Sequence, residues 1–343
     1  MTFLNKNQTI IRKSNGDILN FYVKEGCLFN REFFYKTGWD KPISIIEDLK
    51  HSQLDIKIDN NDFIYGIASN IKGEILYLFS NNNSIHLDTL FKYDINKYSV
   101  KYPYIEKFNN TITIAYYLHE IKHKREWMIA FHYFDGIKWS HKHIYSIKAF
   151  PIINPFLVLI DDKYTNIFYF DLVNGKEEIF IRQFSNNLKA WEMPIQLTNS
   201  NNQKLYLNVL KDKSGIYHIT WSEFLKQNLV VRYLKVSLKE NNFFANDIIS
   251  LSEPANCSFP TFVKTGDALW SVWTQMDKLY SCYSLDCGNT WSDPRIDTKS
   301  ENSIFIRYRF LSNNHQDLRN FNLNNIFGTS YPIMSFLGFK NIK

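Results

Sequence analysis

Two histidines four residues apart form the most specific chemical pattern in this sequence. The segment His119-Glu-Ile-Lys-His123 matches the pattern H-E-x-x-H. On a helix this spacing places both imidazoles on one face, where they can bind Zn²⁺ with the glutamate beside a bound water. Here the segment follows a strand-like run that ends at Leu118, and basic residues interrupt and follow it. We therefore predict a charged loop between two strands, with a zinc site at His119 and His123 as the alternative.

Glutamates offer a second candidate chemistry. Glu177 and Glu178 lie between two apolar runs, and Glu223 occupies the equivalent place in the next group of runs. Paired carboxylates can act as general acid and base on a glycosidic bond when they are held about 5–9 Å apart. Loop carboxylates are more often solvated charges. The prediction for all three is an exposed loop position, with catalysis by Glu177 and Glu223 as the alternative.

The composition is that of a folded globular chain. The 343 residues are 45% hydrophobic and 17% aromatic, which is enough to form a large core. The net charge is +6, but the basic residues are scattered, so no nucleic-acid partner is expected. No apolar run reaches the roughly 18 residues of a membrane-spanning helix, and none is expected.

The N-terminal residues and the spacing of the cysteines predict the cellular compartment. The first residues do not show the basic and apolar regions of a secretory signal, so a cytoplasmic protein is expected, with association with a cell or spore surface as the alternative. No C-x-x-C pair occurs, so reduced thiols and no cofactor are expected. The four cysteines are Cys27, Cys257, Cys282 and Cys287. The high content of Asn, Ile and Lys indicates an AT-rich genome, as in low-GC bacteria.

Short strand-like runs cover nearly the whole chain and recur with a fixed period. They are rich in Ile, Val, Tyr, Phe and Trp, alternate with polar turns, and leave no long segment of helical period. An aromatic residue ends each group of strands at spacings of 48 or 52 residues, at Trp39, Phe91, Trp139, Trp191, Phe243 and Trp291. A period of about fifty residues with four strands per unit is typical of a β-propeller.

The repeats therefore predict an all-β fold, a six-bladed β-propeller that forms a single domain over residues 1–343. Strand-like residues resume after Trp291, at Ile304 to Leu311. Residues 302–343 are predicted to be an atypical closing segment. A seventh blade built from residues 302–339 is the alternative.

One turn carries a recognisable eight-residue pattern. Ser284-Leu-Asp286-Cys-Gly288-Asn-Thr290-Trp291 matches S-x-D-x-G-x-T-W and resembles the Asp-box of sialidase-like (BNR-repeat) β-propellers. We expect Ser284 and Asp286 to accept backbone N–H bonds and Gly288 to adopt a positive φ. We expect Trp291 to pack against a neighbouring blade. The resemblance implies a sialidase-like propeller and a structural role for this turn, on the side away from the ligand.

The same resemblance implies what a catalytic member would need. Sialidases carry an Arg-Ile-Pro turn whose arginine starts a three-arginine clamp on the substrate carboxylate, with a Tyr/Glu nucleophile pair and an Asp acid. No Arg-Ile-Pro occurs here, and the nearest early arginine is Arg12. The preferred interpretation of the other arginines that can face inward is snorkelling or salt-bridged strand residues, and a clamp on an acidic sugar is the alternative. These arginines are Arg182, Arg232, Arg307 and Arg309.

An intact scaffold with an eroded catalytic signature favours binding over catalysis. The prediction is a non-catalytic, sialidase-like propeller that acts as a binding platform for a protein or a glycan. A divergent glycoside hydrolase, of the exo-sialidase type and acting on an acidic sugar, is the alternative. Fold alone does not separate the two.

Overall fold

A computed structural model describes residues 3–34, 36–81, 84–150, 153–239 and 242–339. These residues form two compact units, and each is described by itself. The N-terminal unit contains residues 7–153 and 311–317. The C-terminal unit contains residues 1–6, 154–310 and 318–343.

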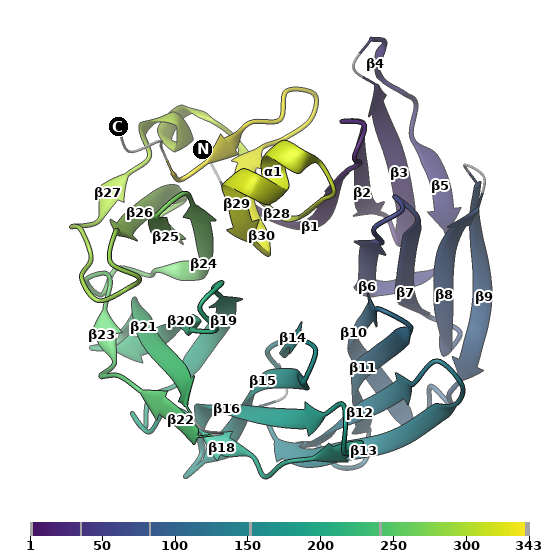
Figure 1. Ribbon diagram of the computed structural model, residues 1–343, viewed down its shortest axis with the longest axis horizontal. Helices are drawn as coiled ribbons and strands as arrows, with labels where there is room; N and C mark the ends of the chain where they lie inside the picture. The colour runs from purple at the N-terminus through teal and green to yellow at the C-terminus, as the bar shows by residue number, and fades with distance from the viewer. Residues whose placement is uncertain (1–2, 35, 82–83, 151–152, 240–241, 340–343) are drawn as a thin grey trace. The chain divides into compact units, whose positions relative to one another are not determined.

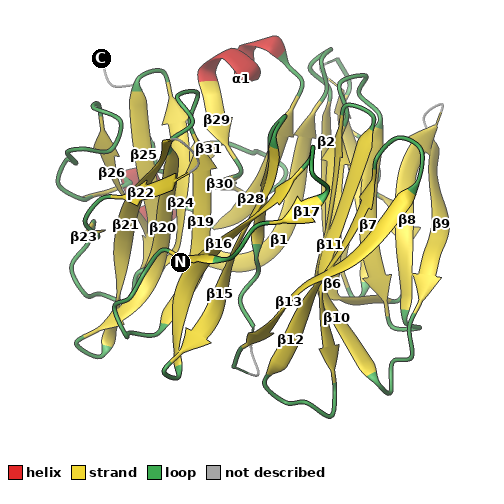
Figure 2. Ribbon diagram, turned by 60° about the horizontal axis from the view of Figure 1, so that its bottom comes forward, coloured by secondary structure: helices red, strands yellow, loops and turns green. Residues whose placement is uncertain are grey.

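Strands dominate the described residues (Figure 2), which form six β-sheets. Helix is limited to α1 (His315–Asn320) and a 3₁₀ turn at Thr298–Asn302. Each sheet is built mainly from strands that follow one another in the chain and pair antiparallel, as in a propeller blade. The predicted all-β fold with six blades is confirmed. No helix among the described residues is long and apolar enough to cross a membrane.

The N-terminal unit holds two four-stranded sheets and the first five strands of an eight-stranded sheet (Figure 1). The five strands are β1 (Phe3–Arg12), β2 (Ile18–Lys24), β3 (Cys27–Phe34), β4 (Gly38–Trp39) and β5 (Ile43–Ile46). The next sheet is β6 (Leu49–Ile58), β7 (Ile64–Asn70), β8 (Glu74–Asn81) and β9 (Ser84–Lys92). The third is β10 (Tyr98–Phe108), β11 (Thr111–Glu120), β12 (Glu126–Phe134) and β13 (Trp139–Lys148).

The C-terminal unit holds three five-stranded sheets. The first is β14 (Leu157–Ile160), β15 (Tyr164–Val173), β16 (Lys176–Ser185), β17 (Ala190–Trp191) and β18 (Ile195–Gln196). The second is β19 (Lys204–Lys211), β20 (Tyr217–Leu225), β21 (Asn228–Lys239), β22 (Asn242–Ala245) and β23 (Ile249–Ser250). The third is β24 (Ser258–Thr265), β25 (Ala268–Gln275), β26 (Lys278–Ser284), β27 (Arg295–Ile296) and β29 (Phe321–Leu323).

The closing segment forms no sheet of its own among the described residues. β29 extends the third sheet of the C-terminal unit by pairing with β24. β28 (Phe305–Ser312), β30 (Asn325–Thr329) and β31 (Phe336–Leu337) pair in that order and belong to the eight-stranded sheet. The closing segment thus adds strands to two of the six sheets, and the alternative of a seventh blade stays a prediction.

Two-residue turns join the second and third strands of several sheets. β15 and β16 are joined at Asn174–Gly175, with φ of 52° and 77°, and β20 and β21 at Lys226–Gln227, with φ of 50° and 65°. Positive φ at both central residues is the type I′ geometry that matches strand twist. Because each turn has only two residues, the strands on both sides extend to it. Glu177, Glu178 and Glu223, which are close to these turns in sequence, therefore belong to strands.

Apolar residues between neighbouring sheets form the cores. In the C-terminal unit one cluster joins the sheets of β15 and β20, with Phe168, Ile181 and Trp221 fully buried. Another joins the sheets of β20 and β25 around Leu269 and Trp273. Corresponding clusters lie between the sheets of the N-terminal unit. Alternating apolar residues thus become buried on both faces, as stacked blades require.

A buried polar relay crosses the second sheet of the C-terminal unit. His218 Nε2 lies 3.4 Å from an Asp212 carboxylate oxygen, and its Nδ1 lies 2.8 Å from the Tyr233 hydroxyl. All three side chains are buried. Burial lowers the pKa of His218 to about 4, although Asp212 acts in the opposite direction. The ring is therefore neutral at pH 7.

The relay predicts a loss of stability in mild acid. The pKa of histidine is about 6.5 in the unfolded chain, and the pKa of His218 in the folded protein is about 4. Between these two pH values the unfolded chain binds a proton at this residue and the folded protein does not, so acid favours unfolding. This single group should remove about 2 kcal/mol of unfolding free energy between pH 7.5 and pH 5. Urea denaturation at the two pH values measures the loss. In His218→Gln the same pH step should cost about 2 kcal/mol less, and an unchanged pH dependence argues against this origin.

Candidate functional site

The three glutamates predicted to lie in exposed loops are instead on strands and buried. Glu177 and Glu178 begin β16, and Glu223 lies near the end of β20, with exposed fractions of 5%, 1% and 0%. The loop prediction is wrong because the type I′ turns shorten the hairpins and because buried cations compensate the charges.

Lys204, the first residue of β19, brings these glutamates together. Its side chain is fully buried, and its ammonium lies 2.9 Å from Glu178 Oε2 and 4.0 Å from Glu223 Oε2. The ammonium also donates to the backbone carbonyl of Glu177 at 2.7 Å. A buried lysine needs such acceptors, since an uncompensated charge is costly away from water. We call Glu177, Glu178, Lys204 and Glu223 the buried charge network.

Both carboxylate oxygens of Glu223 also accept hydrogen bonds from other neighbours. Glu223 receives hydrogen bonds from Trp221 Nε1 at 3.0 Å and from Arg232 Nε at 3.3 Å. Ser200 Oγ and Asn202 Nδ2 complete its partners. Carboxylates satisfied in this way act as structural ion pairs, because they present no free oxygen to a substrate.

Glu177 differs from its neighbours. Its Oε2 is buried without a hydrogen-bond partner among the described residues. Burial raises the pKa of Glu177, although backbone N–H bonds from Glu177 and Lys204 oppose the shift. We therefore interpret Glu177 as a buried acidic residue of β16, next to the β15–β16 hairpin turn.

Two residues beyond Lys204, Tyr206 opens an arginine–aromatic cluster in the same unit. The rings of Tyr206 and Phe259 lie 4.1 Å apart between centroids, and the Arg307 guanidinium lies 4.9 Å from the Phe259 centroid. Phe3 packs against Phe259 at 5.3 Å. Tyr206, Phe259 and Arg307 are each partly exposed, so solvent reaches them. We call these three residues the candidate ligand site.

Bulges in two neighbouring strands position the aromatic residues of this site. The β19–β20 register skips between Leu205 and Asn208, and the β24–β25 register skips between Ser258 and Thr261. Tyr206 and Phe259 sit in these bulges with φ of 58° and 54°. Bulky residues rarely adopt positive φ, and such strain concentrates at ligand sites. The Tyr206 N–H is held by Asn154 Oδ1 at 3.5 Å.

Arg307 lies on β28 and lacks the partner that an arginine normally has. No described residue gives it a hydrogen bond or an ion pair. Burial lowers the pKa of Arg307 to about 10, while nearby Tyr206 acts in the opposite direction. The group stays cationic at pH 7, with five N–H donors open to an anion.

A clamp on an acidic sugar was the alternative for Arg182, Arg232, Arg307 and Arg309, and the contacts of the first two do not favour it. Arg182 donates to the Glu192 carbonyl at 2.8 Å and lies over Trp191, and Arg232 joins Glu223 and Ser250. Arg232 fits the preferred interpretation of a salt-bridged strand residue, whereas Arg182 donates to a backbone carbonyl.

Arg309 lies two residues beyond Arg307, opposite Asn325 of β30. Arg12 pairs with Asp317 in the N-terminal unit. Arg307 lies over the Phe259 ring, and no described residue accepts a hydrogen bond from it.

The two histidines of the H-E-x-x-H pattern face different partners. His119 ends β11 and its Nε2 lies 3.1 Å from the His123 backbone carbonyl, so this nitrogen carries the proton. The His123 ring lies in the turn between Glu120 and Glu126, at 3.8 Å and 3.6 Å. The described residues contain no group of three His, Cys, Asp or Glu side chains placed to bind one metal ion.

The eight-residue turn between β26 and β27 closes on itself through Asp286. Its carboxylate accepts the backbone N–H of Thr290 at 2.8 Å and the Thr290 hydroxyl at 2.7 Å. These bonds hold the pKa of Asp286 well below its usual range. Gly288 has a φ of 83°, and Trp291 packs edge-on against Tyr233 of the neighbouring sheet at 4.9 Å. All four cysteines are free.

Sequence reasoning missed the candidate ligand site, although one signal pointed toward it. Pro260 follows Phe259 inside a strand-like run, and proline within a strand marks an edge or a bulge. Tyr206 has no such marker. The contact between β19, β24 and β28 joins residues a hundred positions apart, which local patterns do not reveal.

Comparison with known proteins identifies the fold. No protein-family model and no curated protein matches this sequence. A PL25 ulvan lyase bound to -[GlcA(1-4)Rha3S]- matches at 12% identity with a TM-score of 0.65, covering 98% of this chain and 94% of that chain. The α-L-arabinanase of Penicillium chrysogenum, complexed with arabinobiose, matches at 10% identity with a TM-score of 0.52 over 81% and 94%.

The GH93 α-L-arabinofuranosidase of Fusarium graminearum, with arabinobiose, matches at 11% identity with a TM-score of 0.51 over 82% and 94%. At these identities the likeness concerns the fold alone. None of the three is a sialidase, so the sialidase-like assignment stays a prediction. What the likeness establishes is that this chain has a β-propeller fold shared with solved structures of carbohydrate-active enzymes.

Proposed function

We propose that this protein is a non-catalytic β-propeller that binds an acidic glycan at the candidate ligand site. The observation that carries the proposal is Arg307, a partly exposed cation that has no acceptor among the described residues and lies over the Phe259 ring. A guanidinium recognises a carboxylate or a sulfate through two parallel hydrogen bonds. Tyr206 and Phe259 supply the aromatic faces on which a sugar ring stacks.

The binding role is favoured over hydrolysis by the state of the glutamates. A glycoside hydrolase needs two carboxyl groups that flank the scissile bond. Glu178 and Glu223 are buried and paired with Lys204, and Glu177 lies enclosed beside them. A fold shared with a lyase that was solved with a glucuronate- and sulfate-containing saccharide agrees with an acidic ligand.

Calorimetric titration of the full chain with a GlcA(1-4)Rha3S oligosaccharide tests the proposal. Arg307→Ala should weaken binding by roughly tenfold to a hundredfold, since a charge-assisted hydrogen bond is worth about 1.5–3 kcal/mol. Arg307→Lys keeps the positive charge but loses the planar guanidinium that can form two parallel hydrogen bonds. Its affinity should therefore lie between those of Arg307→Ala and the unaltered protein.

Arg295→Ala is the matched control, because Arg295 is an exposed arginine of the same unit that is not part of the candidate ligand site. Its affinity should equal that of the unaltered protein. Equal binding by Arg307→Ala refutes the site. Release of reducing ends, or of an ultraviolet-absorbing unsaturated uronate, shows turnover and refutes the non-catalytic role.

A further inference from the structure

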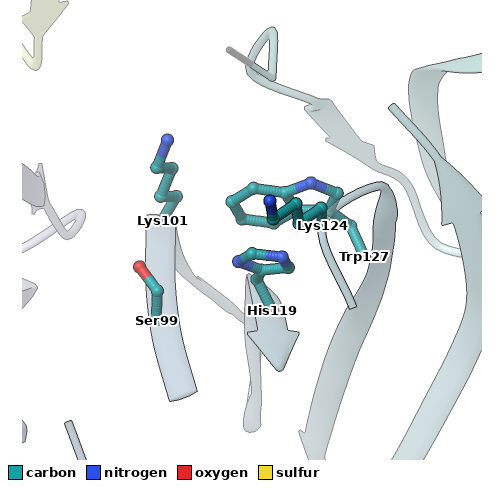
Figure 3. A pocket seen from close by; sticks show the side chains of 5 residues that line it. All are labelled: Ser99, Lys101, His119, Lys124 and Trp127. Atoms are coloured by element: carbon teal, nitrogen blue, oxygen red, sulfur yellow. The ribbon is translucent and has the colours of Figure 1, made fainter. Parts of the chain in front are cut away.

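A cavity lies in the N-terminal unit and shares no residue with the acidic-glycan site. It encloses about 280 Å³ and is lined by Ser99, Lys101, His119, Lys124 and Trp127 (Figure 3). Small-molecule pockets begin at roughly 300 Å³, so this volume suits one small ligand or one sugar residue.

Three adjacent strands build the floor of this cavity. Ser99 of β10 pairs directly with His119 of β11, which places their side chains next to each other on one face. Trp127 of β12 stacks on His119, with ring centroids 4.2 Å apart and planes 16° from parallel. Figure 3 shows the two rings lying one over the other. The floor therefore holds a stacked His119–Trp127 pair, in which Trp127 is 2% exposed, with a hydroxyl at its side.

Two lysines make the cavity cationic. The Lys101 ammonium lies 5.1 Å from the Trp127 ring centroid. Lys124, in the turn after β11, reaches in front of the same ring (Figure 3). The described part of the chain provides no hydrogen bond or ion pair for Lys124. An anion between the two ammonium groups would therefore gain two charge partners at once.

The polar groups between the lysines suit hydroxyls. Because His119 Nε2 donates to the His123 carbonyl, a neutral ring presents Nδ1 as an acceptor. Neither this Nδ1 nor the Ser99 hydroxyl has a hydrogen-bond partner among the described residues. An aromatic face, an acceptor, a hydroxyl and two cations together match a hydroxylated ring that carries negative charge.

The backbone beside the cavity repeats the irregularity found at the candidate ligand site. The β10–β11 register skips between Lys101 and Tyr104, and Tyr102 has a φ of 53°. Tyr206 and Phe259 occupy the same kind of bulge in their strands. Strained bulges of this kind are found where a strand presents side chains to a ligand.

We propose that the Ser99–Lys101–His119–Lys124–Trp127 cavity is a second binding site, for a sugar residue that carries a carboxylate or a sulfate. This site goes beyond the proposed function, because it is in the other unit and shares no residue with the Arg307 site. Two such sites on one chain would give avidity for a polymer with repeated acidic residues.

Fluorine NMR of protein labelled with 5-fluorotryptophan tests this site directly. The sequence has eight tryptophans, and the Trp127 signal is assigned by its loss in Trp127→Phe. Titration with glucuronate and with glucose 6-sulfate at constant ionic strength should shift this signal saturably. A shift with one acid alone tells which anion the site accepts and also supports the proposal. If Trp127→Phe does not fold, Lys124→Ala serves for assignment, because its perturbation is largest at the adjacent ring.

The controls separate this site from simpler explanations. Lys124→Ala should raise the dissociation constant about tenfold, the loss of one charge-assisted contact. Lys122→Ala, an exposed lysine of the same turn that does not line the cavity, should leave it unchanged. Glucose or sodium sulfate shifting the signal as strongly as the acidic sugars overturns the proposal, as does a signal that never moves.

The two sites fail independently in this experiment. Arg307→Ala should weaken binding at the candidate ligand site by roughly tenfold to a hundredfold while the Trp127 signal still responds. A silent Trp127 signal in a protein whose binding still depends on Arg307 removes the second site alone. Loss of the Arg307 dependence with a responsive Trp127 removes the proposed function alone.

Discussion

Replacing Lys204 with methionine is expected to lower the free energy of unfolding by about 3–5 kcal/mol. The ammonium is fully buried and lies 2.9 Å from Glu178 and 4.0 Å from Glu223. Its removal leaves carboxylates enclosed without their cation, and removing one partner of a buried pair costs far more than the pair itself contributes. Urea denaturation followed by tryptophan fluorescence measures the change.

An exposed ion pair of the same unit provides the comparison for this variant. Lys278 and Glu301 are 3.2 Å apart with side chains 46% and 36% exposed, so Lys278→Met should cost no more than about 1 kcal/mol. Adding Glu178→Gln to Lys204→Met should restore part of the loss, since one orphaned charge disappears. Equal losses in the Lys204 and Lys278 variants speak against a buried charge network.

Replacing Gly288 with alanine should destabilise the protein by roughly 2–5 kcal/mol. Its φ of 83° costs an L-residue about 1–2 kcal/mol, and a Cβ would overlap the Tyr233 hydroxyl. Relieving that overlap disturbs a packed interior, which typically costs 1–3 kcal/mol, and displaces the hydroxyl from His218.

Gly266 is the matched control for this prediction. It also has a positive φ, 56°, but an added Cβ would meet nothing within 4 Å. Gly266→Ala should therefore show the backbone cost alone, about 1–2 kcal/mol. Thermal denaturation of both variants makes the comparison, and a Gly288→Ala loss no larger than that of Gly266→Ala means that the contact with Tyr233 is unimportant.

The period of the sequence was sufficient to predict the sheets. Aromatic residues such as Trp139 and Trp191 recur after each group of strands, and the structure places them in the fourth strands β13 and β17. The number of sheets follows from that count. Gly288 could be anticipated in the same way, because a positive φ in a tight polar turn is a local property.

The roles of the charged residues were harder to predict, because they depend on contacts with residues that are far apart in the sequence. Glu178 resembles a solvated charge until Lys204, 26 positions later, is known to lie against it. The alternative of a zinc site at His119 and His123 required both residues to lie on one helix, whereas His119 lies at the end of strand β11. Arg307 could be named as a candidate, but its isolation from acceptors and its aromatic platform are tertiary facts.

The central claim is that a negative charge on the ligand is recognised by Arg307. The most direct measurement is a calorimetric titration of the full chain with the GlcA(1-4)Rha3S oligosaccharide and with the same oligosaccharide after carboxyl reduction and desulfation. The acidic oligosaccharide should bind, and its affinity should fall as the salt concentration rises, because salt screens the attraction between the charges. The neutral oligosaccharide should bind at least tenfold more weakly than the acidic one. Equal affinity for the two forms, or no binding of either, contradicts it.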